Sequence, residues 1–137
     1  MSLISLQNYA EGHWITSKAE GETLYNAITG EALYNANSAG LNFGAMMHYA
    51  RTKGAEKLRK MSFQQRGLML KKLAFHLLEK KELFYKISAL TGATRSDSWV
   101  DIEGGIGNLF ANASLRRQFG NEWFYVEGDV AKLSKQN

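Results

Sequence analysis

Three glycines in four residues, at positions 104, 105 and 107, are the first feature of this sequence that could carry chemistry. Glycine-rich loops bind phosphates through backbone amides, but a dinucleotide loop needs the spacing G-x-G-x-x-G directly after a strand. Residues 104–107 read Gly-Gly-Ile-Gly, and no strand is predicted before them. The pattern favours close backbone packing inside a helix, because each helical glycine costs roughly 1 kcal/mol relative to alanine and a closely fitting partner would offset that cost.

The three histidines do not form a recognisable site. His13, His48 and His76 lie far apart in the sequence, and none has another histidine four residues away. Exposed or hydrogen-bonded histidines are the simpler explanation, so no metal site or acid–base pair is predicted. The chain also contains no cysteine, which excludes disulfides, thiolate metal sites and a cysteine nucleophile.

An acidic cluster beside Arg95 has two explanations. Asp97, Asp101 and Glu103 include pairs of carboxylates that could act in general acid–base catalysis. Capping and favourable charge at the start of a helix account for them more simply. We therefore assign these residues to a helix N-terminus.

The positive charge is concentrated in one stretch. Residues 51–86 contain 11 Lys or Arg and 3 Asp or Glu, which gives this stretch +8 and leaves −4 for the rest of the chain. Such a stretch attracts phosphates, and nucleic acid is one candidate partner. The aromatic residues within it match the apolar side of a helix and are not interleaved with the charges, so a solvated helix face is favoured and no nucleic-acid partner is predicted.

Composition indicates one ordered domain. The chain has 137 residues, of which 45% are apolar and 12% aromatic, enough to bury a core. No run of 18 apolar residues occurs, and residues 1–7 lack the features of a signal peptide, so we expect a soluble, cytoplasmic protein without a membrane partner. Proline is absent, so glycine, asparagine, aspartate or serine must make the turns.

Two hairpins are predicted in residues 8–37. Glu11-Gly12 and Thr29-Gly30 separate runs rich in Tyr, Trp, Ile and Leu, and glycine accepts the positive φ that closes a hairpin. After the hairpins, the apolar residues recur with the 3.6-residue period of a helix. Ser38 is the predicted cap of a first helix that ends or is interrupted at Gly54.

A second, long helix is predicted from the capping box at residues 62–65 to Gly92. A third is predicted from about residue 99 to 119, capped by Asp97 or Ser98, and residues 123–126 form a final strand. The predicted inner face of the second helix comprises Phe63, Leu70, Leu73, Leu77, Phe84 and Ile87, and that of the third comprises Trp99, Ile102, Ile106, Leu109, Phe110 and Ala113.

Several of these segments resemble one family. Residues 12–14 (Gly-His-Trp) and 26–31 (Asn-Ala-Ile-Thr-Gly-Glu) resemble the opening of the aldehyde dehydrogenase superfamily. Residues 91–110, TGATRSDSWVDIEGGIGNLF, resemble one branch more specifically, together with residues 27–33 and 53–55. That branch is the dehydrogenase half of the bifunctional ring-opening enzymes of phenylacetate degradation, which process oxepin-CoA. The resemblance covers most of the chain.

The resemblance implies an α/β aldehyde dehydrogenase as the parent protein, with NADP or NAD as cofactor. The family's chemistry requires a glycine-rich turn and a lysine for the cofactor, a cysteine nucleophile, an oxyanion-binding asparagine and a glutamate that activates water. In the family these follow the point at which this sequence stops. We therefore expect no catalytic residue, no bound cofactor and no metal in this chain alone.

One predicted helix keeps a role in the reaction. In the family the matching helix lines the entry tunnel for the aldehyde, and the resemblance places Val100, Gly104 and Gly107 there. Glycine at position 104, with Gly105 and Gly107 near it, would widen the tunnel mouth for a substrate that carries coenzyme A. The implied partners are the rest of the dehydrogenase chain, a CoA-thioester aldehyde, whose phosphates the basic helices could help to hold, and further copies in a homo-oligomer.

The predicted fragment is α+β, with N-terminal β-hairpins, three main helices and one C-terminal strand. Residues 1–7 are expected to be disordered or added for expression, 8–37 to form the hairpins, 38–120 to be helical, and 121–137 to lead as a strand toward the family's oligomerisation arm. A second hypothesis is a free-standing α+β interaction or scaffold module that performs no chemistry.

Overall fold

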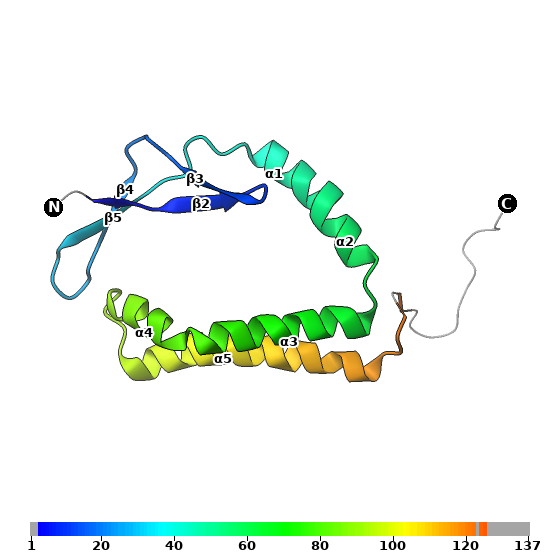
Figure 1. Ribbon diagram of the computed structural model, residues 1–137. Coiled ribbons are helices and arrows are strands. Elements are labelled where there is room, and N and C mark those ends of the chain that lie inside the picture. The colour runs from blue at the N-terminus through cyan, green and yellow to red at the C-terminus, as the bar shows by residue number, and fades with distance from the viewer. Residues whose placement is uncertain (1–2, 123, 126–137) are drawn as a thin grey trace.

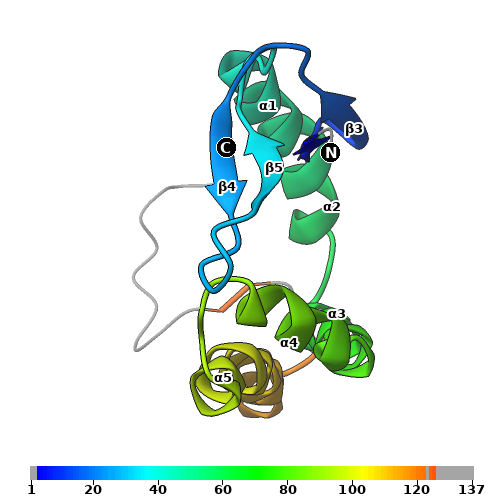
Figure 2. The ribbon, with the colours of Figure 1, turned by 90° about the vertical axis from the view of Figure 1, so that its left-hand side faces the viewer.

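The chain forms an open ring, with strands and a short curved helical segment on one side and packed helices on the other (Figure 1). This computed structural model describes residues 3–122, 124 and 125. Viewed at right angles, the strands and the first helical segment lie together above the later helices (Figure 2). The fold is therefore α+β, with strands first and helices after them.

The first hairpin joins β2 (Gln7–Ala10) to β3 (His13–Thr16) in antiparallel register. Its turn has φ of 51° at Glu11 and 91° at Gly12, the left-handed values that a two-residue hairpin turn requires. Residues 11–12 were predicted to form this turn, and the prediction is confirmed.

The second hairpin joins β4 (Glu22–Tyr25) to β5 (Ala32–Ala36) around Gly30, whose φ is 71°. A short strand, β1 (Ile4–Ser5), pairs parallel to β5 on its other edge. Residues 1–7 were predicted to be disordered or added for expression. Disorder is wrong for this strand, because the edge of β5 offers unpaired backbone groups that a preceding segment can bind.

The first helical segment contains a wide turn. It runs through α1 (Phe43–Tyr49), the π-helix η1 (Ala50–Gly54) and α2 (Ala55–Arg59). The predicted cap Ser38 is wrong. The cap is Asn42, whose side-chain oxygen accepts a hydrogen bond from the Ala45 amide at 2.9 Å. Gly40, with φ of 87°, lies between Ser38 and the helix and prevents an earlier start. Gly54 does not end the segment, which continues through the wide turn.

The predicted second helix is two helices. The capping box at Ser62 and Gln65 is confirmed and begins α3 (Phe63–Glu79). Lys80, with φ of −101° and ψ of 6°, then separates α3 from α4 (Lys81–Ala89). The chain leaves α4 near the predicted Gly92, whose φ is 83°.

The last long helix, α5 (Arg95–Ser114), starts earlier than predicted. Its cap is Thr94, and Asp97 completes a capping box with it, so neither Asp97 nor Ser98 is the cap. A short 3-10 helix, η2 (Leu115–Gln118), extends α5. The region 38–120 is thus mainly helical as predicted, but with more breaks than three main helices allow.

The core lies between α3 and α5. Gly67 and Ala74 of α3 are buried against α5, whose Ile106 and Ala113 are buried in return. A Cβ placed on Gly67 would lie 2.9 Å from the Ala113 carbonyl oxygen, so only glycine allows this approach. The helix pair therefore packs closely at Gly67 through small residues.

The predicted inner faces are partly right. Ile106 and Ala113 are buried as predicted, and Phe110 contacts Phe75 edge to face at 5.0 Å. Trp99, Leu73 and Ile87 were also predicted to face inward, but each is at least 45% exposed. Among the described residues, nothing covers the second side of these helices.

After η2 the chain returns to the start of α3. The Gln64 side-chain amide donates to the carbonyls of Arg116 and Phe119 at 2.7 and 3.0 Å, and the rings of Phe119 and Phe63 stack at 4.7 Å. Of the predicted strand, residues 123 and 126 lie outside the described residues. The two between them, Phe124 and Tyr125, belong to no strand.

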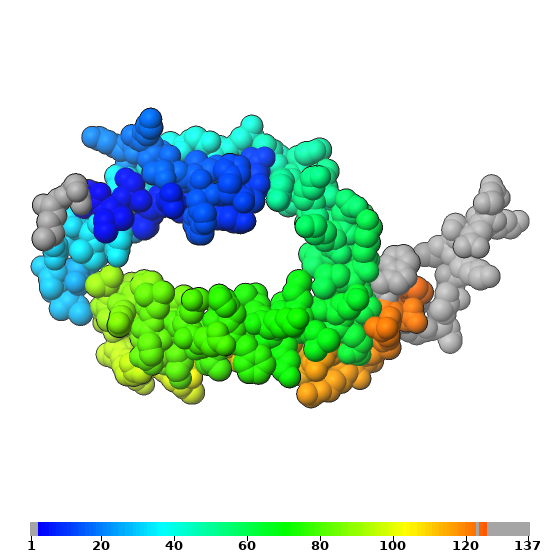
Figure 3. Space-filling model, in the orientation of Figure 1, coloured from blue at the N-terminus to red at the C-terminus, as the bar shows by residue number. Residues whose placement is uncertain are grey.

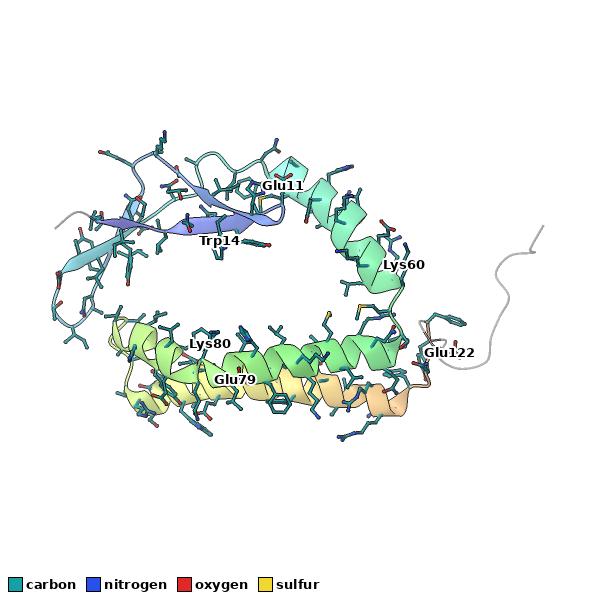
Figure 4. The ribbon with its side chains drawn as sticks, in the orientation of Figure 1. Glu11, Trp14, Lys60, Glu79, Lys80 and Glu122 are labelled. Carbon is teal, nitrogen blue, oxygen red and sulfur yellow. The ribbon has the colours of Figure 1, made fainter. Side chains whose placement is uncertain are left out.

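An opening passes between the strand layer and the helices (Figure 3). The ring closes where the Ala27 amide donates to the Leu90 carbonyl at 2.8 Å. Trp14, 64% exposed, lies beside the opening (Figure 4). In the part of the chain that the structure describes, no helix has the length and apolar character needed to cross a bilayer.

Candidate functional site

The residues predicted to line a substrate tunnel share one exposed face of α5. Val100, Gly104 and Gly107 follow the spacing i, i+4, i+7, which places them on one side of a helix. The buried residues Ile106 and Ala113 lie on the opposite side, at about 100° per residue along the helix. We call Val100, Gly104 and Gly107 the glycine face.

The glycine face is open. A Cβ placed on Gly104, Gly105 or Gly107 would meet no atom within 4 Å among the described residues. The closely packed partner expected from the sequence is therefore absent from this part of the chain. The three glycines weaken α5 without a compensating contact there.

The same glycines do not form a nucleotide loop. Residues 104–107 lie in the middle of α5, more than two turns from its N-terminus at Arg95. Their amides are used in the helix and cannot point at a phosphate, as those of a loop that opens a helix can. These residues therefore do not fit a dinucleotide cofactor.

A polar cluster borders the glycine face. Glu103 accepts hydrogen bonds from the Tyr85 hydroxyl at 2.8 Å and from the Lys81 ammonium at 3.1 Å, both on α4. Tyr85 is buried, whereas Lys81 and Glu103 are partly exposed. We call these three residues the Glu103 cluster. It connects the helix that carries the glycine face to its neighbour.

A second polar contact between α4 and α5 lies nearer the start of α5. The Arg95 guanidinium lies 4.2 Å above the ring of Tyr85 and donates to Glu82 at 3.1 Å. Ser88 and the buried Ser98 share a hydrogen bond of 2.8 Å between the same helices. A hollow of about 320 Å³ lies here, lined by Glu82, Tyr85, Lys86, Ala89, Ala93, Arg95 and Ser98.

The pKa shifts in the Glu103 cluster favour a structural hydrogen-bonded contact. The hydrogen bond from Tyr85 and the adjacent Lys81 ammonium hold the pKa of the Glu103 carboxyl below its usual range. Burial, and then the hydrogen bond to Glu103, raise the pKa of the Tyr85 phenol. Near neutral pH the tyrosine is therefore a donor and the glutamate an acceptor, and neither is poised to exchange a proton.

Sequence reasoning missed this cluster. It assigned Glu103 to the charge at a helix N-terminus, but Glu103 lies in the middle of α5, more than two turns from the cap. Because a single helix was predicted through position 80, the separate direction of α4 was also missed. Tyr85 is not among the residues predicted to face inward, so its burial, and with it the partner that a buried phenol needs, is visible only in the structure.

The other candidate residues are not brought together. His13, His48 and His76 lie on β3, α1 and α3 respectively. Within the described residues, no group of three or more His, Asp or Glu side chains could hold a metal ion.

The basic stretch is spread over several helices, with many of its side chains exposed. A hollow of about 560 Å³ on the first helical segment is lined by Arg51, Thr52, Glu56, Arg59 and Lys60. Glu56 is within this group and pairs with Lys60 at 2.6 Å. This agrees with a solvated face that balances part of its own charge.

Comparison with known proteins gives one informative match. No family model matches the sequence. The chain is 31% identical over 133 residues to 3,4-dehydroadipyl-CoA semialdehyde dehydrogenase of Aromatoleum evansii, a match that covers 96% of this chain and 26% of that protein. The chain thus spans about a quarter of the length of the relative it matches. Over nearly all of its own length, therefore, the chain is similar to part of a semialdehyde dehydrogenase.

Proposed function

We propose that this chain is the N-terminal part of an NAD(P)-dependent aldehyde dehydrogenase that oxidises a CoA-linked semialdehyde. The observation that carries the proposal is the similarity, over 96% of the chain, to a CoA-semialdehyde dehydrogenase. The glycine face adds support, because it offers an open helix surface next to which a bulky substrate could pass.

The substrate within this class follows from the resemblance of residues 91–110 to the enzymes of phenylacetate degradation. On that basis the parent oxidises the semialdehyde formed when the oxepin-CoA ring is opened, with NADP as the favoured cofactor. The relative from Aromatoleum evansii acts, by its name, on a different CoA semialdehyde. Both substrates combine an aldehyde with a coenzyme A thioester, which is the feature that the tunnel must accommodate.

In this proposal the chain shapes the route of the substrate and does not carry out the oxidation. It has no cysteine to attack an aldehyde, and its glycines do not bind a dinucleotide. The glycine face forms one wall of the entry tunnel, and Val100 supplies an apolar contact. The nucleophile and the groups that bind the cofactor belong to the rest of the dehydrogenase.

A direct assay separates this proposal from a scaffold module. The chain alone, incubated with a semialdehyde and NADP or NAD, is expected to produce no reduced cofactor above buffer. The longer dehydrogenase polypeptide implied by the proposal is expected to be active. Turnover that copurifies with the chain alone would refute the assignment of catalysis to other residues, and a longer polypeptide without activity would favour the scaffold.

Placing a larger side chain on the glycine face tests whether it lines the substrate tunnel. In the longer polypeptide, Gly104→Leu is expected to lower kcat/KM steeply for a CoA semialdehyde and much less for a short aliphatic aldehyde, because only the bulky substrate needs the space. Gly105→Leu is the matched control, since it adds the same side chain about 100° around the helix. Equal losses on both substrates, or equal effects of both variants, would remove Gly104 from the tunnel.

A further inference from the structure

The Glu103 cluster is placed where α5 is intrinsically weakest. Glu103 directly precedes Gly104 and Gly105, and Gly107 follows two residues later. Glycine loses more backbone freedom in a helix than any other residue, so this stretch needs contacts that hold it in one conformation. Ile106, buried against the neighbouring helices, supplies an apolar contact, and Glu103 supplies a polar one.

The polar contact is directional. A buried apolar side chain limits distance but tolerates small rotations, whereas a hydrogen bond fixes both distance and angle. The carboxylate oxygen that Tyr85 contacts at 2.8 Å also accepts from Lys81 at 3.1 Å. Both donors belong to α4, so the contact defines how far α5 is turned about its own axis relative to α4.

The donor is itself held in place. Tyr85 is buried, and the Arg95 guanidinium from the first turn of α5 lies 4.2 Å above its ring. Arg95 in turn donates to Glu82, one turn before Tyr85 on α4. The phenol is therefore confined between the two helices, which makes its hydroxyl a rigid reference point for Glu103.

We propose that Glu103 is a positioning residue: its bonds to Tyr85 and Lys81 set the rotation of α5, and thereby the direction in which Val100, Gly104 and Gly107 face. The inference rests on the proposed function, because the glycine face matters only if it lines the route of a CoA-linked aldehyde. It adds a residue that contacts neither substrate nor cofactor and still determines which aldehydes are accepted.

The test uses the longer dehydrogenase polypeptide and two substrates, a CoA semialdehyde and a short aliphatic aldehyde. Glu103→Ala is expected to raise KM for the CoA semialdehyde about tenfold while kcat and the short aldehyde change less than about twofold, because only the wide substrate depends on the orientation of the glycine face. Glu103→Gln keeps an oxygen that accepts from Tyr85, and it is expected to restore most of the lost affinity. Glu56→Ala removes an exposed ion pair with Lys60 on the first helical segment, away from α4 and α5, and serves as the control.

Amide hydrogen exchange of residues 104–108 in the same proteins gives a second readout that does not require activity. Exchange there is expected to rise about tenfold in Glu103→Ala and to stay unchanged in Glu56→Ala. An active wild type in which Glu103→Ala affects both aldehydes equally, or in which exchange does not rise, would overturn this inference alone. A wild type with no dehydrogenase activity would instead refute the proposed function and, with it, the substrate role assigned to Glu103.

Discussion

Two glycines on neighbouring helices have opposite structural roles. Gly67 of α3 packs closely against the end of α5 and η2, where an added Cβ would be 2.8 Å from the Arg116 Cβ and 2.9 Å from the Ala113 carbonyl oxygen. Gly104 faces open space among the described residues. Packing within this chain requires glycine at position 67. No contact among the described residues explains glycine at position 104, so its role belongs to contacts beyond them.

Alanine substitution separates these roles. Gly67→Ala is expected to destabilise the chain, because overpacking costs about 1 to 3 kcal/mol and the gain in helix propensity is only about 1 kcal/mol. Gly104→Ala is expected to stabilise it by up to about 1 kcal/mol. Unfolding in urea, followed by circular dichroism, measures both. A stabilising Gly67→Ala would contradict the close approach of the two helices.

The shifted carboxyl of Glu103 predicts a dependence of stability on acid pH. Its pKa is lower in the folded chain than its ordinary value, mainly because Tyr85 donates to it. A lowered folded pKa gives stability that is present above the ordinary value of about 4.3 and is lost as pH falls through the folded value.

Glu103→Gln, which cannot titrate, makes this dependence measurable. The difference in unfolding free energy between wild type and Glu103→Gln is expected to be largest near neutral pH and to narrow below about pH 4. Urea unfolding over a series of pH values provides the measurement. A difference that stays constant with pH would show that Tyr85 and Lys81 do not stabilise the ionised carboxylate of Glu103 relative to its protonated form.

The helices illustrate what local sequence determines. The capping box at Ser62 was predictable because serine and glutamine stand at the required spacing immediately before an apolar periodic run. Thr94 and Asp97 have the same spacing, but Asp97 and Ser98 are themselves residue types that cap helices, and they obscured the start of α5. Only the structure shows that the Asp97 side chain points back to Thr94 and not forward.

Both caps are expected to contribute measurably to stability. Thr94→Ala is expected to cost about 1 kcal/mol, the usual value for a lost N-cap. Ser62→Ala is expected to cost about as much or more, up to about 2 kcal/mol, because Ser62 is buried and also bonds the Asn121 side chain at 2.9 Å. Ser96→Ala, exposed in the first turn of α5, is a control that should stay within about 0.5 kcal/mol. Equal effects at all three positions, measured by urea unfolding, would contradict the assigned caps.

The break at Lys80 marks the limit of sequence reasoning at this scale. The apolar period continues through it, and neither glycine nor proline marks it. The break changes the direction of α4, which brings Tyr85 to Glu103 and Ser88 to Ser98 on α5. A helix that bends to reach tertiary partners cannot be recognised from its own periodicity.

For the whole molecule, the sequence predicted the class of fold and the order of its parts, but not its open form. Apolar positions such as Leu73 and Ile87 have the spacing of core residues, yet they are exposed because no layer covers them here. Periodicity shows which residues would be buried by a partner, and it cannot show whether that partner belongs to the same stretch of chain. The glycine face presents the same difficulty, since open space beside Gly104 is visible only in the structure.

The open ring predicts that this chain associates when it is isolated. Trp14, Phe43 and Ile28 are each at least 64% exposed, and exposed apolar surface recruits other chains. We expect light scattering at high concentration to show dimers or larger species, and a dye specific for apolar surface to bind. Adding the remainder of the proposed dehydrogenase should suppress the dye signal if it covers the same residues. A strict monomer that does not bind the dye would contradict this prediction, because it would mean that the exposed apolar residues are covered within a single chain.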